Sequence, residues 1–281
     1  MAGVESIAGL ELINASTIED KPDYFRALLY GKPGSGKSYL ASTIAKLGKT
    51  LYIDLVGERG VRSFAGSPWA GNIDIARPTT VQALDDVFYR LEKGDHPYNA
   101  VIIDSLTALQ KMAMRFALGQ SETAVKEITK GGQQAEFRTW GMTLDIMTDT
   151  AIYWNSLADG TRKKPIHVIF TSQVKEVDNE FESTLERVPD VQKGAISQIL
   201  RPTDYVLFTD VEESDEYDSS GDAIQRHIAR IGPHAGYRTK GRIPVHLHGK
   251  VPGILGRGKA PLDLVQLGKI LGVGGMQSAS K

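Results

Sequence analysis

Residues 31–38 read Gly-Lys-Pro-Gly-Ser-Gly-Lys-Ser, which is a complete G-x-x-x-x-G-K-[ST] phosphate-binding loop. The apolar run of residues 26–30 before this loop predicts a short buried strand. Residues 38–47 after it carry apolar side chains at helical spacing and are followed by Gly48, so they predict a helix that ends there. Because this loop needs a strand before it and a helix after it, the sequence predicts an α/β fold built around the loop.

The residue types in the loop are those that bind a nucleoside triphosphate. Glycines let successive backbone N–H groups face the phosphates, and the start of the helix adds its positive end. Lys37 can reach the β- and γ-phosphates, and the Ser38 hydroxyl can ligate Mg²⁺. We therefore expect ATP and Mg²⁺ as cofactors, with ATP bound by Gly31, Lys32, Pro33, Gly34, Ser35, Gly36, Lys37, Ser38 and Tyr39.

Strand and helix patterns alternate along the rest of the chain. This alternation predicts a central, mostly parallel, twisted sheet flanked by helices. The expected strands cover residues 50–55, 100–104, 167–171, 205–209 and 226–231, and the expected helices cover residues 80–92, 105–118 and 135–157. The last of these helices should bury one stripe, at Phe137, Trp140, Leu144, Met147, Ala151 and Trp154.

Three polar stretches are expected to lie outside the regular elements. Residues 119–134 and 175–193 are predicted to be loops. Residues 210–222 are acidic and rich in serine, and we expect them to form a solvated hairpin connection between two late strands. We divide the chain into an N-terminal segment, residues 1–26, an ATPase domain, residues 27–250, and a C-terminal extension, residues 251–281, whose last ten residues should be disordered.

Composition places the chain in a broad class. Hydrophobic residues make up 41% of it, which is enough for a core, and its net charge of −1 identifies no partner. There is no cysteine, so the sequence excludes disulfide bonds and thiolate metal sites. The sequence shows no signal-peptide pattern at its start and no apolar run of about 18 residues. We expect a cytoplasmic protein with no membrane partner.

Acidic and amide side chains that follow predicted strands are the candidates for the chemistry. Asp104 ends an apolar strand, where a carboxylate can hold hydrated Mg²⁺. Many ATPases place a catalytic Glu directly after this Asp, but here the residue is Ser105. We therefore expect the base that orients the attacking water to be Glu58, with Asp54 as the alternative. Gln173 also ends a strand and could hydrogen-bond the γ-phosphate.

A positively charged stretch lies late in the sequence. Residues 223–262 contain eight Lys or Arg residues and no Asp or Glu. The densest cluster includes Arg238, Lys240 and Arg242, with no carboxylate in the stretch to neutralise them. These cations could bind nucleic-acid phosphates or could reach the nucleotide of a neighbouring subunit. We favour the second of these roles.

The order of these motifs resembles the RecA-like recombinase core, over residues 27–245, and is most similar to short bacteriophage RecA-like ATPases. The resemblance implies that Glu58 is the catalytic glutamate and Gln173 the γ-phosphate sensor. It also implies that the loops at residues 119–134 and 175–193 bind single-stranded DNA, and that subunits assemble into a ring or filament with nucleotide between them. A phage origin would place the protein in the host cytoplasm.

Two other functional classes stay open on the sequence. One is an assembly or adaptor protein that binds ATP without DNA-directed catalysis. The other is a P-loop kinase, although the chain shows no clear basic lid over the phosphates. A GTPase is less favoured, because no Asn-Lys-x-Asp motif occurs.

Overall fold

The structure is a computed structural model that describes residues 6–7, 10–11, 24–55, 58–119, 137–179, 184–217, 219–234 and 236–276. Its strands are β1 (Ser6–Ile7), β2 (Leu10–Glu11), β3 (Arg26–Gly31), β4 (Thr50–Asp54), β5 (Ile73–Ala76), β6 (Ala100–Asp104), β7 (His167–Asn179), β8 (Thr184–Pro189), β9 (Tyr205–Tyr217), β10 (Ala223–Arg230), β11 (Lys240–Gly241) and β12 (Ile254–Leu255). Its α-helices are α1 (Lys37–Ser42), α2 (Val81–Glu92), α3 (Leu106–Leu118), α5 (Phe137–Ser156), α6 (Lys193–Leu200) and α7 (Leu264–Leu271). Short 3-10 helices are η2 (Thr43–Leu47), η3 (Gly60–Ser63), η4 (Ala70–Asn72) and η5 (Val245–Leu247).

The main sheet confirms the predicted fold class. Its strand order is β12-β10-β9-β3-β7-β6-β4-β5, and the strands from β9 to β5 run parallel to their neighbours. Strands β10 and β12 join antiparallel beyond β9. Strand β7 lies between β3, which leads into the phosphate-binding loop, and β6, which ends in Asp104. Parallel strands place their carboxyl ends at one edge, so the loop, Asp104 and the middle of β7 meet there.

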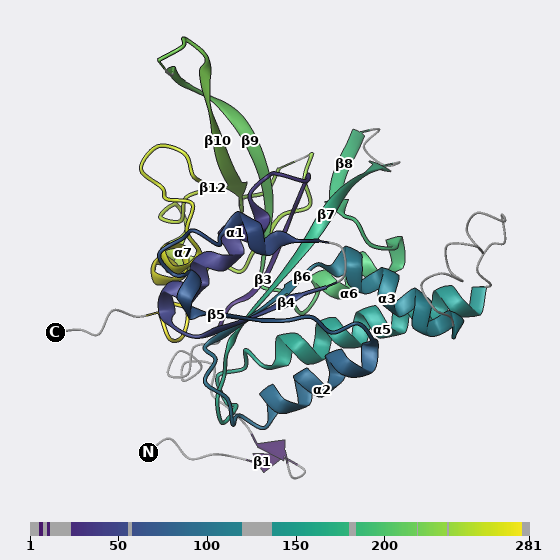
Figure 1. Cartoon of the computed structure of the whole chain (residues 1–281). Coiled ribbons are helices and arrows are strands. Elements are labelled where there is room, and N and C mark those ends of the chain that lie inside the picture. The colour runs from purple at the N-terminus through teal and green to yellow at the C-terminus, as the bar shows by residue number, and fades with distance from the viewer. Residues whose placement is uncertain are drawn as a thin grey trace.

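Helices cover both faces of the sheet (Figure 1). Helices α2, α3, α5 and α6 pack on one face, and α1 and α7 pack on the other. Neighbouring residues of one strand alternate between the two cores: Val168 and Phe170 belong to the first and Ile169 to the second. Burial on both faces explains why these strands are continuous apolar runs in the sequence.

Two long hairpins extend beyond the sheet (Figure 1). Strand β7 pairs with β3 as far as Gln173, and from Val174 onward it pairs with β8. Strand β9 pairs with β3 as far as Thr209 and continues to Tyr217 against β10. The prediction of a loop at residues 175–193 is therefore wrong for most of that stretch. Residues 210–222 lie in a hairpin as predicted, but β9 extends to Tyr217, so most of the expected connection is strand.

The charges that made these stretches look like loops are paired within the hairpins. Glu176 and Arg187 are opposite each other in the β7–β8 register, and the Arg187 Nε donates to the Glu176 Oε1 at 3.1 Å. Glu212 of β9 is opposite Arg226 of β10 in the register, and its carboxylate lies 3.8 Å from the Arg230 guanidinium of the same strand. Opposite charges in facing strand positions stabilise a pair of strands, so a polar segment can form a hairpin outside the core.

Smaller differences concern the helices. The helix expected at residues 38–47 is α1 followed by η2. Trp140 was expected in the buried stripe of α5, but it is 44% exposed, because the first turns of α5 extend past the sheet (Figure 1). Most of the first predicted loop, from residue 120, and residues 277–281 lie outside the described residues. No helix in the described ranges combines the length and apolar character needed to cross a bilayer.

Candidate nucleotide-binding site

The phosphate-binding loop connects β3 to α1 as the sequence predicts. Gly36 precedes α1 and has φ +89°, a left-handed conformation that glycine adopts without steric cost. Gly31, where the loop begins, packs so tightly that a Cβ there would lie 2.3 Å from the Thr209 carbonyl oxygen. The loop is thus held between β9 and the start of α1, where its backbone N–H groups can bind an anion.

Lys37 is folded against its own loop. Its Nζ donates to the carbonyl oxygens of Gly31, at 2.9 Å, and Lys32, at 2.8 Å, and also lies 3.4 Å from the Gln173 Oε1. The side chain is buried, and this burial lowers the pKa of its ammonium group, while the carboxylates of Asp104 and Glu58 oppose the shift. A cation in this position can bind the phosphates of a nucleotide that enters the loop.

Asp104 lies at the end of β6 and is 2% exposed. The Ser38 hydroxyl donates to its Oδ2 at 2.8 Å, and the hydroxyls of Tyr52 and Thr171 also donate to this carboxylate. Burial, followed by the charge of Asp104, raises the pKa of Tyr52, so its hydroxyl stays protonated as a donor. The peptide bond between Asp104 and Ser105 is cis.

The oxygen atoms of Ser38 and Asp104 fit Mg²⁺. Mg²⁺ prefers oxygen ligands and is usually held by one or two protein groups together with phosphate oxygens and waters. Their hydrogen bond at 2.8 Å shows that one ion can reach both groups. Within the described ranges, no cluster of three or more His, Cys or acidic side chains could bind a metal alone. The donor set therefore fits an ion that arrives with a nucleotide.

Glu58 is brought into the same site. The Ser105 hydroxyl donates to its Oε1 at 2.8 Å, and the Gln173 Nε2 donates to its Oε2 at 3.0 Å. Since Gln173 also contacts Lys37, an unbroken series of contacts joins Lys37, Gln173 and Glu58. The alternative base, Asp54, is paired instead with the Arg77 Nε at 2.9 Å.

These residues line one cavity of about 560 Å³ at the carboxyl edge of the sheet. Small-molecule sites usually have volumes of about 300–1,000 Å³. Among the lining residues are Gly36, Lys37, Ser38, Glu58, Asp104 and Gln173. Sequence reasoning did not single out five others, Arg59, Arg62, Ser63, His227 and Leu262. For the two arginines, the sequence offered one signal of a role in the site, namely their position within four residues of Glu58.

The three basic residues of the late segment lie in contacts within the chain. The Arg238 guanidinium is paired with the Glu186 carboxylate, with its Nε at 2.6 Å from the Oε1. Arg242 lies 2.8 Å from Asp204. The expectation that no carboxylate neutralises these cations is therefore wrong, because the acids come from β8 and from the residue before β9.

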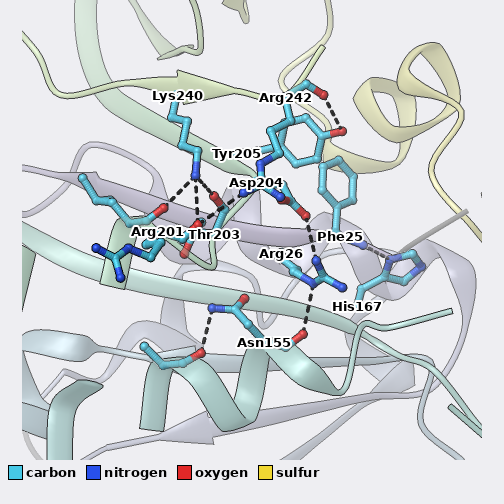
Figure 2. A network of polar contacts seen from close by, with 12 residues as sticks. Phe25, Arg26, Asn155, His167, Arg201, Thr203, Asp204, Tyr205, Lys240 and Arg242 are labelled. Carbon is cyan, nitrogen blue, oxygen red and sulfur yellow. Dashed lines mark hydrogen bonds and ion pairs between the residues drawn. The ribbon is translucent and has the colours of Figure 1, made fainter. Parts of the chain in front are cut away.

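Lys240 stabilises the end of a helix. Figure 2 shows its ammonium group directed at backbone carbonyls at the end of α6 and just after it. It donates to the oxygens of Leu200 at 2.8 Å, Thr203 at 2.5 Å and Arg201 at 3.2 Å. The last carbonyls of a helix have no partner within it, and a cation there is favourable. Contact with DNA or a neighbouring nucleotide stays a prediction for these three cations, and it would require them to leave these partners.

Comparison with known proteins agrees with this geometry. A family profile described as "AAA domain" matches residues 23–243, more than three-quarters of the chain. A search of curated proteins found no relative that matches the chain. The matched range contains the loop, Glu58, Asp104 and Gln173. The chain belongs to the AAA domain family and carries a nucleotide-binding domain of the P-loop ATPase type.

Proposed function

We propose that the protein is a magnesium-dependent ATPase in which Glu58 orients the attacking water. The observation that carries this proposal is the position of Glu58, whose two carboxylate oxygens accept hydrogen bonds from Ser105 and Gln173 beside Lys37. A general base must have a fixed orientation close to the reacting phosphate. This carboxylate is held in place and lines the same cavity as the phosphate-binding loop.

Each side chain has a separate role in the proposed reaction. The loop and Lys37 bind and align the phosphates. Ser38 and Asp104 would hold Mg²⁺, which neutralises phosphate charge when bound. Glu58 accepts a hydrogen bond from the water and orients it toward the γ-phosphate. Gln173 contacts both Lys37 and Glu58, so loss of the γ-phosphate can change its contacts on β7.

The experiment compares binding and turnover in two variants. Lys37→Ala should weaken ATP binding and abolish hydrolysis, because it removes the cation in the loop. Glu58→Gln should still bind Mg²⁺–ATP but hydrolyse it about 10²- to 10⁴-fold more slowly, as expected for loss of a positioned base. The matched control is Glu213→Gln, which makes the same substitution at an exposed residue of β9. A Glu58→Gln variant with the turnover of the control would show that the base is elsewhere.

We further propose that the ATPase is RecA-like, self-assembles and acts on single-stranded DNA. The order of motifs along the sequence supports this proposal, as does β7, which links Gln173 to a projecting hairpin. Adding single-stranded DNA should stimulate hydrolysis, and ATP should increase the mass of the assembly in solution. Turnover and mass that ignore both additions would favour an adaptor role instead.

A further inference from the structure

Arg59 lines the nucleotide cavity and has no role in the proposed reaction. It follows Glu58 directly in the sequence and lines the same cavity as Lys37 and Gln173. Its side chain is exposed, and within the described part of the chain its guanidinium makes no ion pair or hydrogen bond. It is thus a cation at the cavity that has no structural partner in this region.

The backbone around Arg59 is fixed against the metal-binding groups. A Cβ on the next residue, Gly60, would lie 2.2 Å from the Asp104 Oδ2 and 2.6 Å from the Ser38 Oγ. Gly60 therefore packs directly on these two groups. The Arg62 N–H donates to the Arg59 carbonyl oxygen at 3.3 Å as η3 begins. Arg59 is consequently one residue away from the place where Mg²⁺ and the terminal phosphate would lie.

Arg59 also has an uncommon backbone conformation. Its φ of +52° makes it the one non-glycine residue with positive φ in the described ranges. A side chain in this region is disfavoured for L-residues, and such conformations concentrate at functional sites. The conformation is available to glycine at lower cost, so the presence of arginine here indicates a role for its side chain.

The charges of the cavity favour an anion contact by this side chain. Besides Arg59, the cavity lining contains the carboxylates of Glu58 and Asp104, the buried cation of Lys37 and the exposed cation of Arg62. A nucleoside triphosphate adds several negative charges, which Mg²⁺ and Lys37 neutralise only in part. Because Gln173 connects Glu58 to Lys37, the residue beside Glu58 lies at the end of the cavity that would receive the terminal phosphate.

We propose that Arg59 binds the γ-phosphate of the ATP held by its own subunit. This inference rests on the proposed ATPase function. A guanidinium can form two parallel hydrogen bonds to phosphate oxygens, and its charge stabilises the charge that develops during phosphoryl transfer. Arg59 would then distinguish ATP from ADP, while the loop binds the phosphates that both nucleotides share.

The experiment is calorimetric titration of the full chain with Mg²⁺ and either ADP or a non-hydrolysable ATP analogue. Arg59→Ala should weaken binding of the analogue by about 10- to 150-fold, as for loss of a hydrogen bond to a charged group, and should leave ADP binding within about twofold of wild type. Arg59→Lys, which keeps the charge but loses the fork geometry, should be intermediate. Arg90→Ala, which removes an exposed cation of α2, is the matched control.

The possible outcomes separate this inference from the function on which it rests. Wild-type protein that binds neither nucleotide would refute the ATPase proposal itself. If the wild-type protein binds ADP and the ATP analogue, and Arg59→Ala weakens both to the same extent or neither, only the γ-phosphate assignment is overturned. Recovery of analogue binding when Arg59→Ala subunits are mixed with Lys37→Ala subunits would place Arg59 on a neighbour's nucleotide, and would overturn the assignment within one subunit.

Discussion

The Ser105 hydroxyl makes two hydrogen bonds whose effects can be measured separately. It donates to the Glu58 Oε1 at 2.8 Å, and it accepts from the Ala108 N–H at 3.2 Å as the N-cap of α3. Ser105→Ala removes both. Loss of an N-cap costs about 1 kcal/mol of folding stability, and loss of a hydrogen bond to a charged group costs about 1.5–3 kcal/mol. If the second loss appears fully in the transition state, turnover falls by roughly 10- to 150-fold.

Two further substitutions at this position separate the contributions. Ser105→Gly lacks the donor to Glu58, but glycine is nearly as good an N-cap as serine, so the variant should lose turnover with only a few tenths of a kcal/mol in stability. Ser105→Thr keeps the hydroxyl and should keep most of the turnover and most of the folding stability. Thr80→Ala removes the equivalent cap of α2, where the Thr80 hydroxyl accepts from the Ala83 N–H at 3.1 Å. It should lose stability with unchanged turnover.

The assay is steady-state ATP hydrolysis at saturating Mg²⁺–ATP, paired with denaturant unfolding of each variant. We expect turnover to depend on the hydroxyl at position 105 and folding stability to depend on the N-cap. Equal turnover in Ser105→Ala and Thr80→Ala would show that the hydrogen bond to Glu58 does not position the base. A loss of ATP binding that matches the loss of turnover would also refute the argument, since the hydroxyl would then act on binding.

Two other predictions concern tight packing and pH. Gly60→Ala should weaken Mg²⁺–ATP binding by about 5- to 160-fold, because a Cβ 2.2 Å from the Asp104 Oδ2 creates overpacking of about 1–3 kcal/mol. Gly66 has open space around it, so the Gly66→Ala variant should bind Mg²⁺–ATP normally in the same titration. Burial lowers the pKa of His167 to about 3 in the folded protein. Below about pH 6.5 the unfolded chain therefore binds a proton at this histidine that the folded protein does not. The free energy of unfolding should then fall as the pH drops toward 3, by at most about 1.4 kcal/mol per pH unit. His167→Asn, which can still accept from the Phe25 N–H, should show a shallower fall in unfolding free energy between pH 6.5 and 4.5, and an unchanged slope would contradict this assignment.

The sequence was sufficient to predict the parts of the site that depend on local order. The loop, its strand and the start of its helix are neighbours in the chain, so residues 26–42 carried their own structural context. The carboxylate of Asp104 was predictable for a related reason, since an apolar strand that ends in an acid delivers that acid to the edge of a parallel sheet. The contacts that place Glu58 and Gln173 together depend on the strand order, which no local pattern encodes.

Long-range pairing explains where the sequence interpretation went wrong. Arg238 and Arg242 looked unneutralised because their acids, Glu186 and Asp204, lie 52 and 38 positions earlier in the sequence. The β7–β8 segment looked like a loop because it is rich in charged residues, of which Glu176 and Arg187 pair across the two strands. In both cases the compensating group comes from a different element, so charge counted along the sequence overstates the charge at the surface.

The alternation of side chains in β7 shows how one strand serves both the site and the fold. Residues two apart in a strand lie on the same face, and a shift of one residue in register would exchange the faces. Thr171 and Gln173 lie on the same face of β7: the buried Thr171 donates to Asp104, and Gln173, which lines the nucleotide cavity, donates to Glu58. Ser172 faces the opposite side, where its hydroxyl lies 3.2 Å from that of Thr107 in α3. The Thr-Ser-Gln sequence therefore contacts α3 through its middle residue, while its two outer residues hydrogen-bond Asp104 and Glu58.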